Sequence, residues 1–459
     1  MVLKPVHGAY HSTRLFAEVI SIGGRALAVF MALLIIFSLL VGAARCDKAE
    51  ESENENKTEG VSSRTSVTEG ERGDYTALNY RVTKAVWLSQ FDMTRIYTDG
   101  VGQRDIADYT ARVGQVVENI KSLGMNTVII QLRPNGDSIY PSELYPTSKY
   151  LTGEYGREAD YDAFAVFLEL AHGAGLSVHA WINPLRCMSE IEISSVPMEY
   201  AVRRWYAEEN GRYTVAVGGV CYLNPAYGEV RSLICDGVGE ILDRYEVDGI
   251  HIDDYFYPTT AESFDAEAYS AYVGGGGILS LADFRREQIN TLVRDIYATV
   301  KNRNHTVLFG VSPGGNNDRN YNELYADVAK WCANEGYIDY LCTQVYFGFE
   351  HESRPFDKVC EEFSDMIKTD SISLIVGMTL GKAYGGYSGE VDAWAGSGSR
   401  EWIENRDILR RSLEYIQTMD KCGGAAFFSY QYFFDVQSGL PTQHTSEECS
   451  ELIPVLKKM

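Results

Sequence analysis

The strongest constraint on the fold is a regular alternation of strand-like and helix-like segments that begins near residue 80. Short runs rich in Val, Ile and aromatic residues occur eight times, and each is followed by a longer stretch with helical periodicity. We predict strands at 85–89, 127–132, 177–182, 249–253, 307–312, 340–346, 373–379 and 424–430. Alternating strands and helices form parallel sheets, so eight units in about 370 residues predict an α/β fold, the (β/α)8 TIM barrel.

The helical stretches between these strands are amphipathic. Apolar residues recur at three-and-four spacing over 113–123 and again over 230–242, which gives each helix one face to bury. Glycines at Gly124 and Gly175 follow two of the helices and are typical helix stops. No glycine-rich phosphate-binding motif follows the first strand, which argues against a doubly wound dinucleotide-binding fold.

The chain before the barrel divides into three parts. Residues 1–25 are basic, which predicts a cytoplasmic N-region. Residues 26–46 include nineteen consecutive uncharged residues, enough for either a cleaved signal peptide or a retained transmembrane anchor. Residues 47–78 are acidic and poor in large apolar side chains, which predicts a disordered linker. We therefore expect an exported or cell-envelope location, a catalytic domain over 79–445 and a C-terminal helix or tail over 446–459.

The acidic composition narrows the class of partner. The chain has 64 Asp and Glu residues against 41 Lys and Arg residues, a formal net charge of -23. Nucleic acids and anionic membrane surfaces require a basic footprint, so we expect no nucleic-acid partner and membrane contact through the N-terminal segment only. A neutral or cationic ligand is easier to accommodate. The oligomeric state does not follow from the sequence.

The nine cysteines form no recognisable metal or disulfide framework. No CxxC pair is present, so the spacing typical of a zinc site is absent. Isolated buried thiols are the expected state, and a bridge between Cys187 and Cys221 is the alternative. Cys46 could instead belong to a lipoprotein signal, but Arg45 stands where such a signal has a small residue. A lipid anchor is therefore less favoured than a cleaved signal peptide or a transmembrane anchor.

The segment 248–258 carries the most chemistry. It predicts a buried strand that runs directly into two adjacent carboxylates and an aromatic cluster. Successive side chains of a strand point to opposite faces, so His251 and Asp253 share one face while Asp254 lies on the other. Active sites of TIM barrels lie at the carboxyl ends of the strands. We therefore expect Asp253 to point into the mouth of the barrel.

Polar and aromatic residues also end or follow other predicted strands. Any one of them has a simpler explanation, because Asn, Asp and Ser cap helices and aromatic residues pack under loops. Together they favour a carbohydrate site, in which aromatic faces stack on pyranose rings and polar groups bond to hydroxyls. The candidate substrate-binding residues are His251, Arg133, Asn135, His179, Trp181, Asn183, Tyr255, Ser312, Gln344 and Tyr346.

Longer motifs resemble those of the glycosyl-hydrolase-like family ten. They are Leu-Arg-Pro-Asn-Gly-Asp at 132–137, His-Ala-Trp-Ile-Asn-Pro at 179–184, Asp-Gly-Ile-His-Ile-Asp-Asp-Tyr-Phe-Tyr-Pro at 248–258, Phe-Arg-Arg-Glu-Gln-Ile-Asn at 284–290 and Tyr-Ile-Asp-Tyr at 337–340. The resemblance implies a (β/α)8 catalytic domain, usually exported or membrane-anchored in bacteria, and a glycan substrate, for some members peptidoglycan strands stripped of their peptides. It implies Asp253 as the principal catalytic carboxylate, with His251 beside it.

Glycoside hydrolysis normally requires a second carboxyl group. The sixth, seventh and eighth strands end in Gln344, Thr379 and Gln431 rather than in an acid. The candidates for the second carboxyl, in order of preference, are Asp254, Asp137, Glu350 and Asp92.

These patterns predict a glycoside hydrolase that acts on a cell-envelope or extracellular glycan through Asp253, Asp254 and Asp137. The missing acid at the last three strands leaves an alternative, a non-catalytic carbohydrate-binding protein that uses the same groove. A metal-dependent deacetylase is a third alternative. We expect no cofactor and no metal, because hydrolysis needs none and no HExxH motif is present.

Overall fold

The computed structural model describes residues 75–208 and 211–459. The predicted N-region, the apolar segment over 26–46 and all but the last four residues of the predicted linker lie outside these ranges. Within the described ranges, no helix is both long and apolar enough to cross a bilayer.

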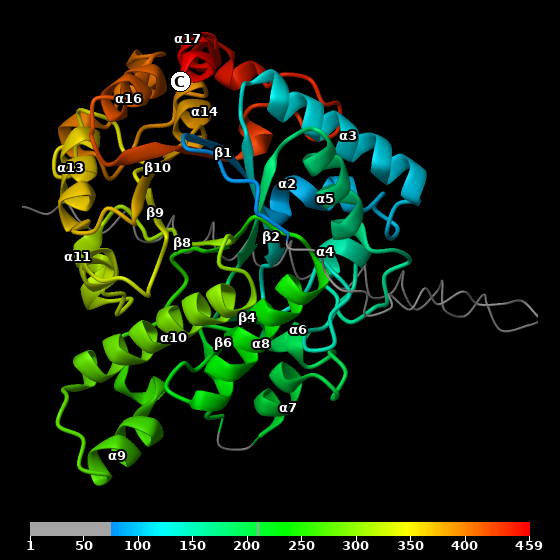
Figure 1. Ribbon diagram of the computed structural model, residues 1–459, viewed down its shortest axis with the longest axis vertical. Coiled ribbons are helices and arrows are strands. Elements are labelled where there is room, and N and C mark those ends of the chain that lie inside the picture. Colours follow the sequence, from blue (N-terminus) through cyan, green and yellow to red (C-terminus); the bar gives the residue numbers. More distant parts are fainter. Residues whose placement is uncertain (1–74, 209–210) are drawn as a thin grey trace, which may run out of the picture. The chain divides into compact units, whose positions relative to one another are not determined.

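Eight parallel strands close into a barrel, as the sequence predicts (Figure 1). They are β1 (Thr83–Leu88), β2 (Thr127–Arg133), β3 (Ser177–Ile182), β7 (Gly249–Ile252), β8 (Leu308–Val311), β9 (Tyr340–Gln344), β10 (Ser373–Thr379) and β11 (Cys422–Phe428). They follow one another around the barrel in sequence order, and β11 pairs with β1 to close it. All eight predicted strands are confirmed.

A helix follows each barrel strand and lies on the outside of the barrel (Figure 1). These helices are α3 (Ile106–Ser122), α5 (Ala163–Gly173), α8 (Gly228–Arg244), α10 (Leu281–Arg303), α12 (Val328–Ala333), α13 (Phe356–Met366), α16 (Ile408–Ile416) and α17 (Ser446–Lys458). Leu452 and Leu456 of α17 are fully buried, and Glu448 accepts a hydrogen bond from the backbone N–H of Leu409 in α16. The helical layer of the barrel therefore continues past residue 445.

Shorter elements occupy the loops. The helices are α2 (Gln90–Tyr97), α4 (Lys149–Thr152), α6 (Glu190–Ile193), α7 (Ala201–Ala207), α9 (Ala266–Gly274), α11 (Asn317–Asn322), α14 (Gly381–Tyr387) and α15 (Glu401–Glu404). Single 3-10 turns are η1 (Glu262–Phe264), η2 (Gly396–Gly398), η3 (Tyr430–Tyr432) and η4 (Gln443–Thr445).

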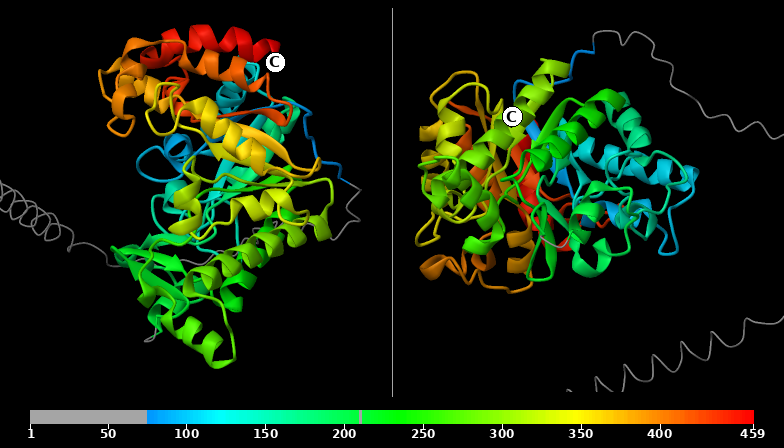
Figure 2. Two further views of the ribbon diagram at one scale, coloured as in Figure 1. Left: turned by 90° about the vertical axis from the view of Figure 1, so that its left-hand side faces the viewer. Right: turned by 90° about the horizontal axis from the view of Figure 1, so that it is seen from below.

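A three-stranded antiparallel sheet, which the sequence reasoning missed, is inserted between β3 and α8. Its order is β4 (Arg186–Ser189), β6 (Val220–Leu223), β5 (Thr214–Val217). Figures 1 and 2 place it on the same side of the barrel as α9 and the start of α10. The β5–β6 turn is Gly218-Gly219, with φ of 59° and 84°. Two glycines between apolar runs are a hairpin signal, so this part of the insert was readable from the sequence.

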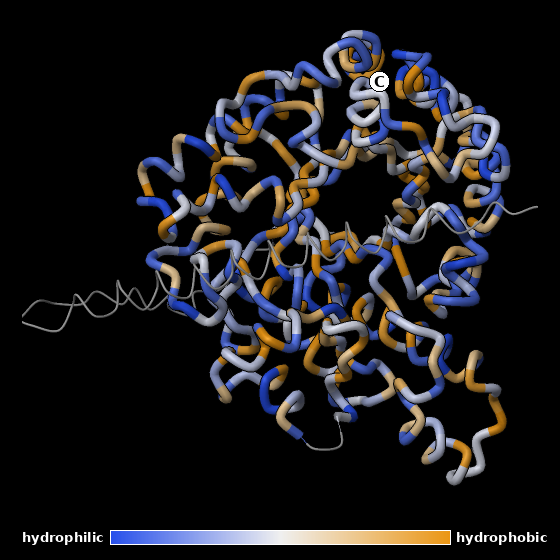
Figure 3. Tube along the Cα trace, turned by 180° about the vertical axis from the view of Figure 1, so that it is seen from behind, coloured by the Kyte–Doolittle hydropathy of each residue, from blue (hydrophilic) through white to orange (hydrophobic). Residues whose placement is uncertain are grey.

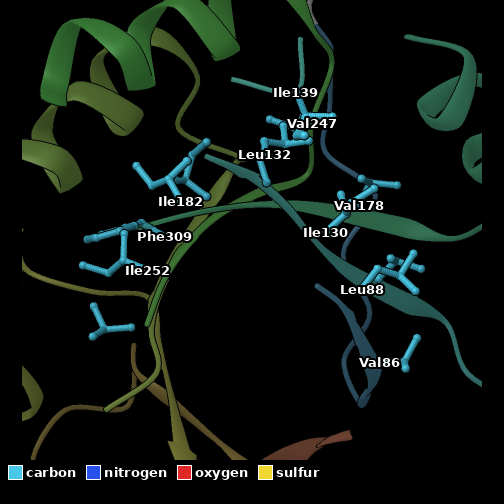
Figure 4. Packing of buried hydrophobic residues seen from close by; sticks show 14 of the residues in the cluster. Val86, Leu88, Ile130, Leu132, Ile139, Val178, Ile182, Val247, Ile252 and Phe309 are labelled. Atoms are coloured by element: carbon cyan, nitrogen blue, oxygen red, sulfur yellow. The ribbon is translucent and has the colours of Figure 1, made fainter. Parts of the chain in front are cut away.

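The barrel wall separates two apolar clusters. Side chains such as Val86, Ile130 and Ile252 lie on the outer side of the strands and pack under the helices (Figure 4). A smaller cluster, which includes Trp87 and Tyr340, fills the interior. The two clusters arise because alternate residues of each strand face opposite sides. Hydrophobic stretches accordingly recur along the barrel strands, and many hydrophilic ones lie on the periphery (Figure 3).

Asp248 closes the amino-terminal end of the barrel. It accepts hydrogen bonds from the Tyr75 hydroxyl (2.5 Å), the Leu78 N–H (2.5 Å) and the Val178 N–H (2.7 Å), and it lies 2.9 Å from His172 Nε2. These contacts tie the segment before β1 to β3 and to the start of β7. Asp248 therefore has a structural role at the end of the barrel opposite the predicted site.

Candidate active site at the mouth of the barrel

A cavity of about 280 Å³ opens at the carboxyl ends of the strands. Its lining combines two adjacent carboxylates with amides, one arginine and a group of aromatic rings. The lining residues are Trp87, Ser89, Gln90, Phe91, Gln131, Trp181, Arg186, Asp253, Asp254, Tyr255, Ser312, Gln344, Tyr346 and Phe428. Aromatic faces beside a few directional polar groups are typical of a sugar site.

A chain of three amides holds Asp253 at the end of β7. The Asn183 amide donates to both carboxylate oxygens, at 2.8 and 2.7 Å. Asn183 Oδ1 accepts from Gln131 Nε2 (2.6 Å), and Gln131 Oε1 accepts from the backbone N–H of Gln90 (2.9 Å). Gln90 is the first residue of α2, so its N–H has no partner within the helix.

The backbone N–H of Gln90 determines the orientation of the two side-chain amides that follow it, those of Gln131 and Asn183. A backbone N–H can only donate, so Gln131 must turn its oxygen toward Gln90 and its NH2 group toward Asn183. Asn183 must then present its NH2 group to Asp253. Asn183 therefore positions the carboxylate of Asp253.

Both carboxyl groups have raised pKa values. Burial raises the pKa of Asp253 well above its usual range, the charge of Asp254 raises it further, and the hydrogen bonds from Asn183 oppose the rise. Burial also raises the pKa of Asp254, opposed by the Gln344 amide, which donates to Asp254 Oδ1 at 3.3 Å, and by the positive charge of Arg319. Two like charges this close do not both ionise freely, so the pair retains a proton at a higher pH than isolated aspartates would.

Seven of the residues predicted from the sequence do line this cavity. They are Asp253, Asp254, Trp181, Tyr255, Ser312, Gln344 and Tyr346. Trp181 is 6% exposed and forms part of the floor, whereas Tyr255 is 42% exposed and lies at the rim. The Arg186 guanidinium lies 4.8 Å from the centre of the Tyr255 ring, which holds that ring at the edge of the cavity.

Arg133, Asn135 and Asp137, which the sequence analysis assigned to the site, lie outside this cavity. The pairing of β2 with β3 shifts register between Gln131 and Arg133, so Arg133 leaves the interior face that alternation predicts for it. Its guanidinium lies 4.0 Å over the Tyr145 ring and is 1% exposed. Asp137 is fully buried and accepts from the Asn135 N–H at 2.7 Å, and burial raises its pKa to about 6. None of the three lines the cavity.

His179 and His251, the two histidines predicted to contact substrate, lie inside the barrel and do not line the cavity. Trp87 Nε1 donates to His251 Nε2 at 3.4 Å, so His251 Nδ1–H donates to the Tyr340 hydroxyl at 2.9 Å. That hydroxyl then donates to His179 Nδ1 at 2.8 Å, and His179 Nε2 faces Asn79 at 3.4 Å. Burial lowers the pKa of His179 to about 4 and lowers that of His251 as well, so both rings are neutral.

The other two acids considered for the second carboxyl also lie outside the cavity. Asp92 is fully buried and accepts from the Ser89 hydroxyl (2.5 Å) and from the Gln431 N–H (2.7 Å), which joins the ends of β1 and β11. Glu350 is exposed and does not line the cavity. Among the described residues, Asp254 is therefore the one acid that shares the cavity with Asp253.

The sequence reasoning did not assign functions to several residues that shape the cavity. Trp87 and Phe428 supply aromatic surface, and Gln90 and Gln131 supply the amide chain. Alternation along β1 and β2 could have indicated Trp87 and Gln131, since each is an interior position near the carboxyl end of its strand.

Metal ligands and disulfides do not form part of the described structure. In residues 75–208 and 211–459, no group of three or more His, Cys, Asp or Glu residues is arranged to hold a metal ion. The eight cysteines within those ranges are free thiols, Cys187 and Cys221 among them.

Comparisons with solved structures agree with the barrel. The glycoside hydrolase domain of PgaB (BpsB) from Bordetella bronchiseptica aligns with a TM-score of 0.53 and 14% identity, covering 82% of this chain and 99% of that one. The catalytic domain of β-amylase from Paenibacillus polymyxa aligns with a TM-score of 0.52 and 9% identity, covering 81% and 98%. At these identities the likeness shows the fold alone.

Comparisons with sequences are more specific. Glycosyl hydrolase YngK of Bacillus subtilis (strain 168) is 32% identical over 321 residues, which cover 66% of this chain and 61% of that protein, less than two thirds of its length. Glycosyl hydrolase DigH of Escherichia coli (strain K12) is 28% identical over 386 residues, covering 76% of this chain and 83% of that protein. A family model described as Glycosyl hydrolase-like 10 matches residues 82–386. The chain belongs to the glycosyl hydrolase-like 10 family.

Proposed function

We propose that this protein is a glycoside hydrolase that cleaves a cell-envelope or extracellular glycan, with peptidoglycan strands stripped of their peptides as the first candidate. The observation that carries the proposal is the pair Asp253 and Asp254, which share one aromatic-lined cavity at the carboxyl ends of the strands. Hydrolysis of a glycosidic bond uses two carboxyl groups in different protonation states. The mutual interaction of this pair favours one proton shared between them.

The two carboxyl groups divide the reaction between them. The protonated carboxyl transfers its proton to the glycosidic oxygen as the bond to the anomeric carbon breaks. The ionised one either attacks the anomeric carbon or takes a proton from the water that attacks it. Asn183 keeps Asp253 in place throughout, and the rings of Trp181 and Tyr346 hold the sugar and exclude water.

A second candidate function is glycan binding without cleavage. The observation that favours it is the absence of an acid at the ends of β9, β10 and β11. Gln344 and Thr379 end β9 and β10, and Gln431 lies in the turn that follows β11. The binding surface would be the same cavity, with Asp253 and Asp254 as hydrogen-bond acceptors for sugar hydroxyls.

We also propose that the domain acts outside the cytoplasm, with residues 26–46 as a signal peptide or membrane anchor. The basic residues before this apolar segment support that orientation. Cell fractionation with an antibody against the domain tests this proposal. Recovery of the full-length protein in the cytoplasmic fraction alone would contradict it.

The activity test uses the full-length protein with intact peptidoglycan and with the same glycan stripped of its peptides. Products are identified by mass spectrometry for the wild type, Asp253→Asn, Asp254→Asn and the matched control Asp370→Asn. Asp370 is exposed and precedes β10 at the opposite end of the barrel. New fragments that disappear in the two site variants and persist in the control support the hydrolase. Saturable binding with no new fragments supports the non-catalytic alternative.

A further inference from the structure

A second cavity adjoins the one that contains Asp253 and Asp254. Its volume is about 250 Å³, and it shares Gln344 and Tyr346 with the first cavity. Its other walls come from the loops that follow β8, β9 and β10. Because these two side chains form a wall common to both cavities, a ligand that extends past them leaves one cavity and enters the other.

Trp394 lines this second cavity and is 85% exposed. The backbone around it is well anchored. The Trp394 N–H donates to Asp392 Oδ1 (3.3 Å), the Ala395 N–H donates to Asp392 O (3.1 Å), and the Glu352 N–H donates to Ala395 O (3.0 Å). The fold thus presents a large apolar ring to solvent from a fixed turn, and a ligand that stacks on it orders only the two side-chain torsions of the tryptophan.

The polar groups of the cavity suit hydroxyl groups. Lys382 Nζ forms an ion pair with Asp392 Oδ2 at 2.8 Å, and the Asp392 side chain is only 3% exposed. The pair is neutral as a whole, and its more exposed partner, the Lys382 ammonium, presents donors beside the indole. Asn316 and Asn320 line the same cavity. Arg319 adds a guanidinium to the lining. An aromatic face with several hydrogen-bonding groups beside it matches a sugar, which has an apolar ring face and hydroxyl groups at its edge.

We propose that this cavity is a second sugar-binding subsite, in which Trp394 stacks on a pyranose ring of the glycan whose neighbouring linkage lies at Asp253 and Asp254. The inference rests on the proposed function and adds a substrate class to it. The preferred substrate is a chain long enough to fill both cavities, rather than a disaccharide.

The test compares peptide-stripped strands of two, four and six sugars as substrates for the full-length protein. Trp394→Ala raises KM for the six-sugar strand about three- to tenfold with little change in kcat, because one stacking contact is lost. The loss is smaller for the two-sugar strand, and Trp394→Tyr restores part of it. Tyr80→Ala is the matched control, since Tyr80 is 37% exposed and bonds to Gly175 O at the opposite end of the barrel.

Two results overturn the subsite. One is an unchanged KM for every strand length in Trp394→Ala, and the other is an equal loss for two and six sugars. If the wild type cleaves no strand, hydrolysis fails as a function but the subsite is still tested by calorimetric titration with the six-sugar strand. Weaker binding by Trp394→Ala than by Tyr80→Ala then supports the subsite, whereas equal affinity or no binding at all overturns it.

Discussion

The side-chain amide nitrogen of Asn183 donates to both carboxylate oxygens of Asp253, at 2.8 and 2.7 Å. This double contact fixes the plane of the carboxylate and favours its ionised form. Because Asn183 is itself oriented through Gln131 by the Gln90 N–H, the position of Asp253 depends on β1, β2 and β3 as well as on β7.

Asn183→Ala is expected to lower kcat about a hundredfold, a loss typical of removing a preorganising hydrogen bond. The pKa of Asp253 should rise, because the bonds that favour its ionised form are gone, so the limb of the pH–rate profile that Asp253 governs should move to higher pH. Steady-state kinetics from pH 4 to 9 measure both effects. Asn334→Ala, on the exposed end of α12, is the control, and an unshifted profile in Asn183→Ala would show that Asn183 does not position Asp253.

Asp254→Asn is expected to stabilise the protein at pH 7 by about 1 kcal/mol, since it removes a charge from a pair whose pKa values are raised on folding. A raised carboxyl pKa means that folding is penalised above the unfolded-state pKa of about 4 and not below it. The gain in Tm should therefore shrink as the pH is lowered toward 3. Thermal unfolding at both pH values measures it, with the exposed Asp370→Asn as control. A variant that is less stable at pH 7 would contradict the like-charge argument.

Tyr340→Phe should destabilise the barrel by about 1–3 kcal/mol, because the lost hydroxyl leaves a buried donor on His251 and a buried acceptor on His179 without their partner. The amide chain at Asp253 does not involve Tyr340, so kcat should change far less than stability. Urea unfolding and steady-state kinetics test the two statements. Tyr297→Phe, on the partly exposed face of α10, serves as control. Equal stability of the two variants would show that the interior hydroxyl is dispensable.

The contribution of His179 to the free energy of unfolding should fall as the pH is lowered from about 6.5 to about 4, opposite in sign to that of the carboxyl groups with raised pKa values. The pKa of His179 is about 4 in the folded protein and 6.5 when unperturbed, so the unfolded chain takes up its proton first. This contribution is thus fully present above pH 6.5 and is lost toward the folded-state pKa. Chemical denaturation across this range should show the stability of His179→Gln, relative to that of the wild type, increasing as the pH is lowered. His305→Gln, which changes an exposed histidine, should keep the wild-type slope.

The three-stranded insert shows why the sequence prediction was incomplete. Its strands have four residues each, too short for their alternation to stand out from the loops around them. The second cavity could not be predicted from the sequence either. Trp394 is an isolated aromatic residue in a long loop, and it becomes informative only when its 85% exposure is known.

The sequence by itself determined the barrel and the inward direction of Asp253, because strand and helix periodicities are local and every second residue of a strand faces the same side. Tertiary structure alone decided which other inward-facing residues line the cavity. The register shift after Gln131 removes Arg133 from the interior, and the stagger of the strands leaves His179 and His251 below the cavity. Depth along a barrel depends on how neighbouring strands are offset, and that offset is a property of the closed sheet rather than of any one strand.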